Sequence, residues 1–203
     1  RQRGLETHSP AGDLLVQARA EADPAQVGAV DVVLLAVKTY DNATALPMVK
    51  TLLSKAESPA SSEGLPVVLP LQNGVDSPGE LAALVGERAI LGGSAYISAA
   101  VSRPGVITQT GTHQRITFGE FFGDTSRLTT RVTTLRDVLA GAGITVEAVP
   151  DARVALWDKL IFLAPFAGVT GCARLPIGRL WPQPASRETY LAAPAKGCPV
   201  ARA

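Results

Sequence analysis

One short apolar run, residues 30–37 (VDVVLLAV), constrains the fold of this chain more than any other feature. Apart from Asp31 its residues are apolar, and most of them are β-branched or leucine. This length and composition predict a strand covered on both faces, as in a parallel sheet. Lys38 follows directly, at the carboxyl end of the strand, where open α/β sheets place their ligands. Lys38 is therefore a candidate site residue, and a solvated strand-end charge is the alternative that stays open.

A second apolar run, residues 65–71 (LPVVLPL), repeats this plan and is followed by Gln72, Asn73 and Gly74. Asn-Gly by itself indicates only a turn. Asn73 gains interest because it would share a sheet edge with Lys38. The sequence therefore predicts a binding site at the ends of two neighbouring strands.

Helical patterns alternate with these strands. Apolar residues at helical spacing fill residues 42–53, where Asp41 or Asn42 is the expected cap. A loop rich in Ser and Pro at residues 58–64 leads into the second strand, and residues 76–86 form a second helix that ends at a glycine. The order strand, helix, strand, helix predicts an α/β chain with a doubly wound sheet.

Residues 94–102, 106–110 and 115–119 are expected to form strands joined by tight turns, which add an antiparallel extension at the edge of this sheet. The segments with a strand pattern are residues 5–8 and 14–19, which suit a hairpin, and residues 89–92, 94–102, 106–110, 115–119 and 144–149. Asp124 or Thr125 is expected to cap a helix between the last two. Its apolar stripe consists of Leu128, Val132, Leu135, Val138 and Leu139.

A helix of a different kind is predicted after Asp151, because residues 154–163 are apolar on nearly every side. Such a helix is typical of the interior of a larger body. We therefore place a domain boundary near Pro150, which gives a sheet domain at residues 1–150 and a helical segment at residues 151–203. The second part is too short for an independent helical domain, and the last helix is expected to be interrupted by its prolines, Pro194 and Pro199.

Lys159 is the strongest candidate for chemistry. It lies among large apolar residues of this helix, and burying an unpaired ammonium is costly. None of its helical neighbours at positions 155, 156, 162 and 163 is acidic, and Asp158 points elsewhere on the helix. A functional lysine and a lysine whose head group reaches solvent along its own stem both remain open.

Composition excludes several classes of protein. The chain has 203 residues and a formal net charge of +1 without a basic face, so we expect no nucleic-acid partner. The longest uninterrupted apolar run, residues 160–169, is too short to span a bilayer, and no secretory leader opens the chain. Cys172, Cys198, His8 and His113 lack metal-ligand spacing, so we expect no metal site. A cytoplasmic protein with no membrane partner is the simplest interpretation.

Several segments together resemble the ketopantoate reductase family (2-dehydropantoate 2-reductase). They are DVVLLAVKTYD at 31–41, LPLQNGVDSPGEL at 69–81, GGSAYISAAVSRPGVI at 92–107, ITFGE at 116–120 and the stretch 142–159 that ends in WDK. The similarity runs over residues 3–178, and the order of AVKTYD, QNGV and W-x-K is specific to the family.

This resemblance implies a Rossmann domain that binds NADPH, a following all-helical domain, and a substrate between them. The family reduces 2-dehydropantoate, a 2-oxoacid, to pantoate on the route to pantothenate and coenzyme A. Lys38 and Asn73 match the family's cofactor-contacting lysine and asparagine, Ala100 matches a backbone contact, and Lys159 matches the catalytic lysine. An ammonium suits that role, because it can donate a proton to the alkoxide that forms as hydride arrives. A homodimer of the full-length protein is a further expectation.

The chain departs from the family at both ends. Residues 1–4 have the pattern of a helix ending, so we expect the family's glycine-rich loop before Arg1. The fold expected here is therefore an incomplete Rossmann-type doubly wound sheet, followed by the start of an all-helical C-terminal domain. Well-known members carry asparagines where this chain has Leu163 and Ala167. A reductase for another 2-oxoacid and a catalytically inactive fragment are the two alternatives.

Overall fold

The computed structural model describes the backbone of residues 4–54 and 66–202, and the side chains of residues 4–54 and 66–194. The helix ending predicted at residues 1–4 falls outside this range apart from Gly4. The loop predicted at residues 58–64 falls outside it entirely.

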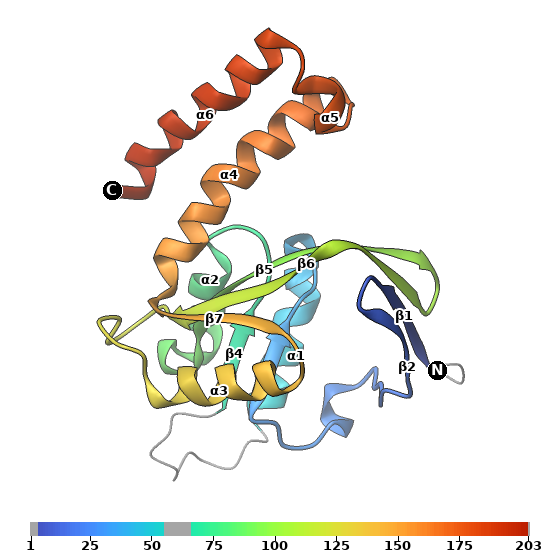
Figure 1. The fold of residues 1–203 in the computed structure, drawn as a ribbon. Helices are drawn as coiled ribbons and strands as arrows, with labels where there is room; N and C mark the ends of the chain where they lie inside the picture. The colour runs from blue at the N-terminus through green and yellow to red at the C-terminus, as the bar shows by residue number, and fades with distance from the viewer. Residues whose placement is uncertain (1–3, 55–65, 203) are drawn as a thin grey trace.

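The strands of the described chain form two adjoining sheets, and helices pack against these sheets or extend from them (Figure 1). The strands are β1 (Leu5–Ser9), β2 (Gly12–Val16), β3 (Val32–Leu35), β4 (Val67–Pro70), β5 (Leu91–Arg103), β6 (Val106–Glu120) and β7 (Thr145–Asp151). The α-helices are α1 (Asn42–Leu53), α2 (Ser77–Val85), α3 (Thr130–Gly141), α4 (Ala152–Ala173), α5 (Ile177–Leu180) and α6 (Pro184–Arg202). Short 3₁₀ turns are η1 (Pro24–Gln26), η2 (Thr39–Asp41) and η3 (Glu87–Ala89).

The smaller sheet is the parallel pair β3 and β4, in which Val32 lies beside Val67 and Leu35 beside Pro70. α1 follows β3 and α2 follows β4, so the predicted order of strand, helix, strand and helix is confirmed. Because the strands are parallel, their carboxyl ends lie at the same edge.

The larger sheet has the strand order β2-β1-β6-β5, and β7 also pairs with β6. The predicted hairpin is β1 and β2, and β5 and β6 are likewise antiparallel, whereas β1 and β7 run parallel to β6. A parallel bridge between Val68 and Ile90 joins β4 to the start of β5. The predicted α/β class is therefore confirmed, and the antiparallel extension adjoins the parallel pair through this bridge.

β4 is covered on both faces. Val67 and Leu69 pack with Phe118 in the core beneath α3, and Val68 packs with Leu81 beneath α1 and α2. Alternate residues of a strand point to opposite faces, so both layers rest on this one strand. All four residues of β4 are buried, as its apolar sequence predicts.

β3 is only half covered, which corrects the prediction made from residues 30–37. Leu35 is buried, but Leu34 is 46% exposed and Val37 is 39% exposed. Within the described chain β3 pairs with β4 alone, so its other edge carries no strand there. An apolar run shows what a strand can bury, whereas the layers around it depend on distant parts of the chain.

β5 and β6 replace the four separate strands predicted between residues 89 and 119. The prediction ended one strand at Gly92 and started the next at Ser94, which left Gly93 as a break between them. A Cβ added at Gly92 would lie 2.7 Å from Ala152 Cβ, and one added at Gly93 would lie 2.4 Å from Leu69 Cδ1. These glycines therefore serve close packing on the two faces of a continuous strand.

α3 begins later than predicted. Thr129 stands at its N-cap instead of Asp124 or Thr125, and Leu128 precedes the helix. The Asp124 carboxylate accepts hydrogen bonds from the backbone N–H and the hydroxyl of Ser126, which closes a turn before the helix. Of the predicted stripe, the buried residues are Val132, Leu135 and Leu139, and Val138 is exposed.

α4 starts where predicted, with the Asp151 carboxylate as its cap, but most of it is not buried. Ala152 and Leu156 are buried, whereas Val154 is 61% exposed and Phe162 is 54% exposed. The prediction of a buried helix is thus wrong for the described chain. α4 as a whole has the length and composition of a membrane span, unlike the shorter run of residues 160–169, but one such helix is weak evidence for a membrane.

α6 continues through Pro194 and Pro199, so the predicted interruption is wrong. A proline removes one backbone donor and disturbs one turn, while the turns on either side keep their hydrogen bonds. α4, α5 and α6 extend away from the sheets, and α6 packs back along α4 (Figure 1). The chain passes from β7 directly into α4, and the domain boundary near Pro150 stays a prediction.

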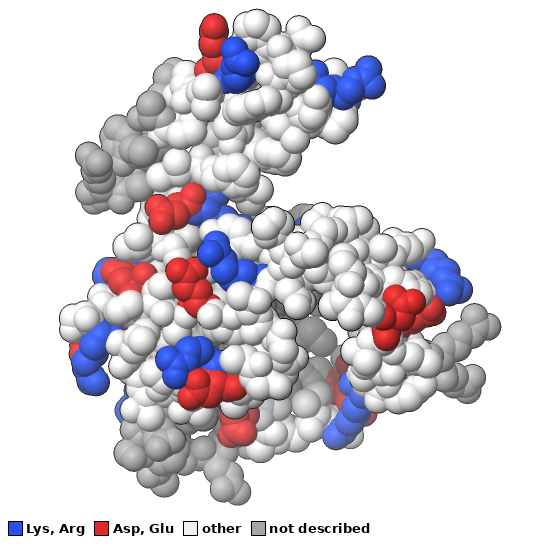
Figure 2. Space-filling view, viewed as in Figure 1, with Lys and Arg blue, Asp and Glu red and all other residues white. Residues whose placement is uncertain are grey.

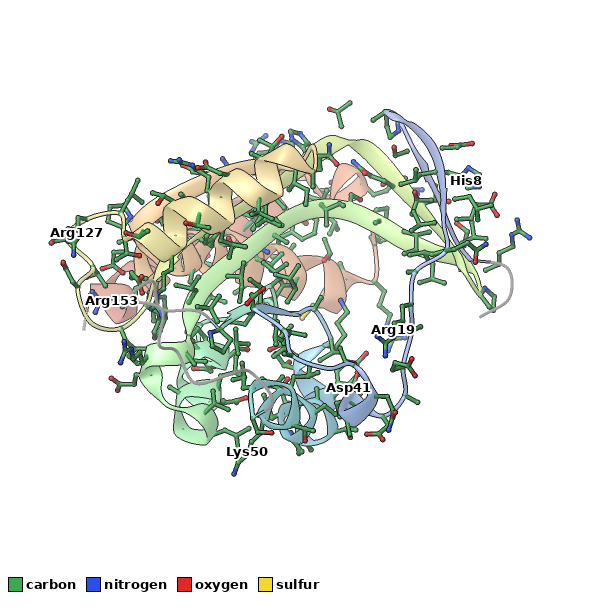
Figure 3. The ribbon with its side chains drawn as sticks, turned by 90° about the horizontal axis from the view of Figure 1, so that it is seen from below. His8, Arg19, Asp41, Lys50, Arg127 and Arg153 are labelled. Carbon is green, nitrogen blue, oxygen red and sulfur yellow. The ribbon has the colours of Figure 1, made fainter. Side chains whose placement is uncertain are left out.

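Charged side chains of both signs are intermingled on the visible face of the molecule (Figure 2). Seen from below, His8 lies at the hairpin end of the structure, while Arg127 and Arg153 lie close together at the opposite end (Figure 3). This distribution gives no large single-sign surface on the face shown.

Candidate active site

The chain segments that follow β3 and β4 enclose a cavity of about 220 Å³. Residues 36–40 form one wall and residues 71–73 form the other. Lys38 and Asn73 both line this cavity, and both are exposed. The structure thus brings together the two residues that the sequence placed at one sheet edge.

Gln72 is the buried polar residue of this cavity, and the sequence analysis did not single it out. It is 6% exposed, and its Nε2 donates to Val37 O at 2.8 Å and to Asn42 Oδ1 at 2.7 Å. Its Oε1 is buried and has no hydrogen-bond partner among the described residues. The one sequence signal for it was its place directly after a buried strand.

Lys159 lies on the face of α4 that packs against β5. Helical spacing puts Ala152, Leu156 and Lys159 on one face, and a Cβ at Gly92 would contact the first two. Lys159 Nζ donates to Ala95 O at 2.6 Å. Among the described residues no carboxylate pairs with this ammonium, and its partial burial lowers the pKa of Lys159 below the ordinary lysine value.

Tyr96 gives Lys159 an aromatic neighbour that sequence reasoning missed. Lys159 Nζ lies 5.0 Å from the centroid of the Tyr96 ring, and the Arg115 guanidinium carbon lies 4.6 Å from it. Arg115 stands opposite Tyr96 in the β5–β6 register and pairs with Glu147 at 3.2 Å. The negative face of an aromatic ring attracts cations. Tyr96 and Arg115 also line a cavity of about 550 Å³ beside α4.

Gly93 brings the end of β4 close to β5. A Cβ at this position would lie 2.4 Å from Leu69 Cδ1 and 3.2 Å from Pro70 O. β4 and β5 run in the same direction from the bridge that joins them. The cavity after β4 and the Ala95 carbonyl that holds Lys159 therefore lie on the same side of Gly93 along the two strands.

Ala100 is not brought to this place. It lies on the exposed part of β5 and pairs with Thr108. At about 3.3 Å per residue, it stands roughly 16 Å beyond Ala95 along the strand. The structure therefore groups Lys38 with Asn73, bonds Lys159 of α4 to Ala95 of β5, and leaves Ala100 apart.

A third cavity, of about 460 Å³, lies beside a buried ion pair. Glu120 is 3% exposed, and the Arg131 guanidinium donates to both of its carboxylate oxygens. Thr129 Oγ1 also donates to this carboxylate, and Arg131 donates to the backbone oxygen of Arg88. Because these groups are engaged with each other, the pair serves the fold. Among the described residues no cluster of three His, Cys, Asp or Glu could hold a metal ion.

An α/β body with a parallel strand pair, and with polar residues lining a cavity at the carboxyl ends of those strands, is typical of Rossmann-like proteins. Comparison with known proteins agrees with this class. Residues 1–123 match the family model described as ketopantoate reductase PanE/ApbA. This match covers more than half of the chain, so the chain belongs to the ketopantoate reductase family, and the resemblance found in the sequence is confirmed.

Individual similar proteins are consistent with membership of this family. The 2-dehydropantoate 2-reductase of Nostoc is 31% identical over 83% of this chain and 51% of that protein. An uncharacterized oxidoreductase of Bacillus subtilis, YkpB, is 27% identical over 93% of this chain and 58% of that protein. The crystal structure of 2-dehydropantoate 2-reductase from Geobacter metallireducens has a TM-score of 0.85 and 27% identity, and it matches 100% of this chain and 63% of its own. The chain thus spans less than two thirds of the length of each of these proteins. The structural match confirms the Rossmann-like fold followed by the start of a helical domain.

Proposed function

We propose that the protein is an NADPH-dependent reductase that converts 2-dehydropantoate to pantoate in pantothenate and coenzyme A biosynthesis. The observation that carries the proposal is the state of Lys159. Its ammonium is half-buried, lacks a carboxylate partner among the described residues, and is held on the sheet by Ala95 O. Partial burial lowers the pKa of this lysine, and a lowered pKa makes its ammonium a better proton donor.

The cavity of Lys38 and Asn73 fits one end of a nicotinamide cofactor. Its volume of about 220 Å³ lies below the range of roughly 300–1,000 Å³ that holds a whole drug-sized ligand. Lys38 supplies a positive charge for a phosphate or an adjacent dipole, and Asn73 supplies both a donor and an acceptor. These two residues are proposed to hold the cofactor, and Ala100 is kept as a backbone contact on the family resemblance alone.

When bound, the cofactor supplies the hydride that reduces the keto carbon. The chain's own part is proton transfer by Lys159. An ammonium has three N–H donors, so the bond to Ala95 O leaves others free for the substrate carbonyl oxygen. As negative charge develops on that oxygen, the Lys159 N–H bond breaks and an O–H bond forms. The neutral amine then regains a proton from water.

The test is Lys159→Ala in the full-length protein, with Lys50→Ala as the control. Lys50 is exposed on α1, so its removal should leave turnover unchanged. General acid catalysis contributes about 10²–10⁴-fold, and we expect kcat for NADPH oxidation with 2-dehydropantoate to fall by that order in Lys159→Ala. Near-normal kcat in this variant would remove Lys159 from the mechanism.

A related reductase that acts on another 2-oxoacid is the second candidate. Leu163 and Ala167 follow Lys159 by four and eight residues on the same helix face, and neither offers a side-chain hydrogen bond. An apolar substrate group would suit these positions better than a hydroxyl. A panel of branched 2-oxoacids at fixed NADPH separates the two candidates, and a strong preference for 2-dehydropantoate would exclude the second.

The third candidate is a catalytically inactive fragment. The expected glycine-rich loop is not part of this sequence, and pyrophosphate normally rests on the helix that follows such a loop. Fluorescence titration of these 203 residues with NADPH, and in parallel with NADH, tests this candidate. Micromolar affinity would contradict it, and the same titration decides between the two cofactors.

The whole-protein setting is also a proposal. We propose a cofactor domain at residues 1–150, the beginning of a substrate and dimerisation domain at residues 151–203, and a cytoplasmic homodimer without nucleic-acid or membrane partners. Cell fractionation and light scattering of the full-length protein test the location and the dimer. A membrane-bound fraction, or a monomer at micromolar concentration, would contradict them.

A further inference from the structure

Gln72 connects the two walls of the Lys38–Asn73 cavity. Its side-chain amide donates to the carbonyl of Val37, which directly precedes Lys38. Its own backbone directly precedes Asn73. One buried side chain therefore fixes the distance between the chain segment of Lys38 and that of Asn73.

The orientation of the Gln72 amide is imposed by its partners. Asn42 Nδ2 donates to Glu80 Oε2 at 2.7 Å, and an ionised carboxylate only accepts hydrogen bonds. The Asn42 amide must therefore turn its NH₂ group to Glu80 and its oxygen to Gln72. Gln72 must in turn present its NH₂ group, which donates to Asn42 Oδ1 at 2.7 Å. Glu80 thus determines, through Asn42, which way Gln72 faces.

This arrangement has a local cost. Gln72 Oε1 is left buried with no hydrogen-bond partner among the described residues. Buried acceptors are nearly always satisfied, because burying an unpaired one is unfavourable. Rotating the amide would not satisfy the oxygen, because it would then face two acceptors, Val37 O and Asn42 Oδ1, and both present hydrogen bonds would be lost. The fold keeps the orientation that ties the two walls together.

We propose that Gln72 is a positioning residue that sets Lys38 and Asn73 for the nicotinamide cofactor, with its orientation imposed by Glu80 through Asn42. This inference rests on the proposed cofactor role of the cavity. Gln72 itself acts through the segments on either side of it. Glu80 lies on the exposed side of α2, so it can be changed without disturbing the core.

The experiment compares Glu80→Met with Glu80→Gln in this chain. Both substitutions remove the charge and have similar size, but only glutamine retains an oxygen that accepts from Asn42. We expect the Kd for NADPH, from fluorescence titration, to rise about tenfold in Glu80→Met and by less than about threefold in Glu80→Gln. Both variants should have the same Tm within a few degrees. Equal Kd values for the two would overturn the proposal.

Gln72→Met is the direct variant, because methionine has similar length and no donor. Its matched control is Gln109→Met on β6, where the amide donates to Gly111 O and His113 O, away from the cavity. We expect Gln72→Met to weaken NADPH binding at least as much as Glu80→Met, and Gln109→Met to leave it unchanged. A folded Gln72→Met with unchanged Kd would overturn the proposal.

Hydrogen exchange separates this inference from the proposed function. If the unaltered chain binds neither NADPH nor NADH, the cofactor role of this chain fails. The exchange rates then decide the positioning role alone. The Asp41 amide, bonded to Lys38 O, should exchange about tenfold faster in Glu80→Met than in Glu80→Gln. The Leu71 amide, bonded to Leu35 O, should be unchanged, and equal rates at Asp41 would overturn the inference.

Discussion

At the scale of single residues, the pKa of Lys159 depends on neighbours that have opposite effects on it. Partial burial disfavours the charged form and lowers the pKa of Lys159. The Ala95 carbonyl and the Tyr96 ring face both favour the charged form. Tyr96 is therefore expected to keep the ammonium protonated at a pH where burial alone would favour the neutral amine.

We predict that Tyr96→Leu lowers the pKa of Lys159 further. Leucine keeps the site apolar but removes the ring face, which contributes about 0.5–1 kcal/mol to a cation at such a site. The pH above which kcat/KM declines should therefore move down in the full-length protein. Tyr96→Phe keeps the ring and is the matched control, so the prediction fails if Leu and Phe variants give the same profile.

His8 carries the clearest pH dependence outside the candidate site. Its ring lies 2.8 Å from Asp13 and 2.9 Å from Glu6, and the hydrogen bond with Asp13 is the main reason that its pKa is raised above 6.5. A raised folded-state pKa stabilises the β1–β2 hairpin fully below 6.5, and this stabilisation is lost as pH rises through the folded-state pKa.

We predict that the hairpin amides exchange faster, after correction for intrinsic rates, at pH 8.5 than at pH 5.5. His8→Ala should abolish that difference, because no titrating ring remains between the two carboxylates. His113→Ala on β6 is the control and should retain it. The prediction is contradicted if His8→Ala keeps the full pH dependence. Arg127 and Arg153 lie at the opposite end of the molecule, and the pH effect of His8 should not extend to amides there (Figure 3).

At the scale of elements, local signals and distant packing contributed differently. α2 was predictable because its signals are local, with Asp76 at its N-cap, a proline in its first turn and Gly86 after its end. The joining of short strands into β5 was not predictable, because a strand that reaches Gly92 and Gly93 is expected to end there until the helix and strand that pack on these glycines are known. Neighbours in sequence indicate local structure, whereas the role of these glycines depends on packing against residues far away in the sequence.

The candidate site shows the same division. Lys38 and Asn73 were predictable because each follows a recognisable apolar strand. The partners of Lys159 were not, because Ala95 is 64 residues away in sequence and no helical neighbour announces it. Gln72 was missed because its three-residue network joins positions 42, 72 and 80, which share no local pattern.

Gly119 is the position where one methyl group should damage an element most. A Cβ there would lie 1.9 Å from Val149 O, on the paired strand β7. The clash is with backbone and cannot be relieved by a side-chain rotation. We predict that Gly119→Ala destabilises the chain by about 2–3 kcal/mol in urea unfolding, or prevents folding.

Gly79→Ala is the matched control for this substitution. Gly79 lies inside α2 with nothing within 4 Å of an added Cβ. Alanine is favoured over glycine within a helix, so this variant should be more stable by up to about 1 kcal/mol. Equal stability changes in the two variants would show that the contact with Val149 does not constrain Gly119.

At the scale of the whole molecule, the two ends of α4 have different packing partners. Its first turns pack on β5, where Ala152 and Leu156 cover Gly92 and Lys159 bonds to Ala95. Beyond these turns it extends from the sheets and packs beside α6 (Figure 1). The proposed division near Pro150 therefore marks where a new element starts, while the change of surroundings falls inside that element.

We predict that hydrogen-exchange protection divides within α4, near Lys159. Amides of residues 156–160 should open only with the sheet, because their turns are fixed by buried contacts and by the Lys159 bond. Amides of residues 166–173 should exchange at least about tenfold faster, because the helix there has exposed faces and, in the described chain, extends from the sheets to pack with α6 and α5. α3 lies on the sheet and serves as the control, with protection that should vary less along its buried turns. Uniform protection along α4 would show that the helix and the sheets unfold as one unit, and would contradict both this division and the proposed two-part organisation.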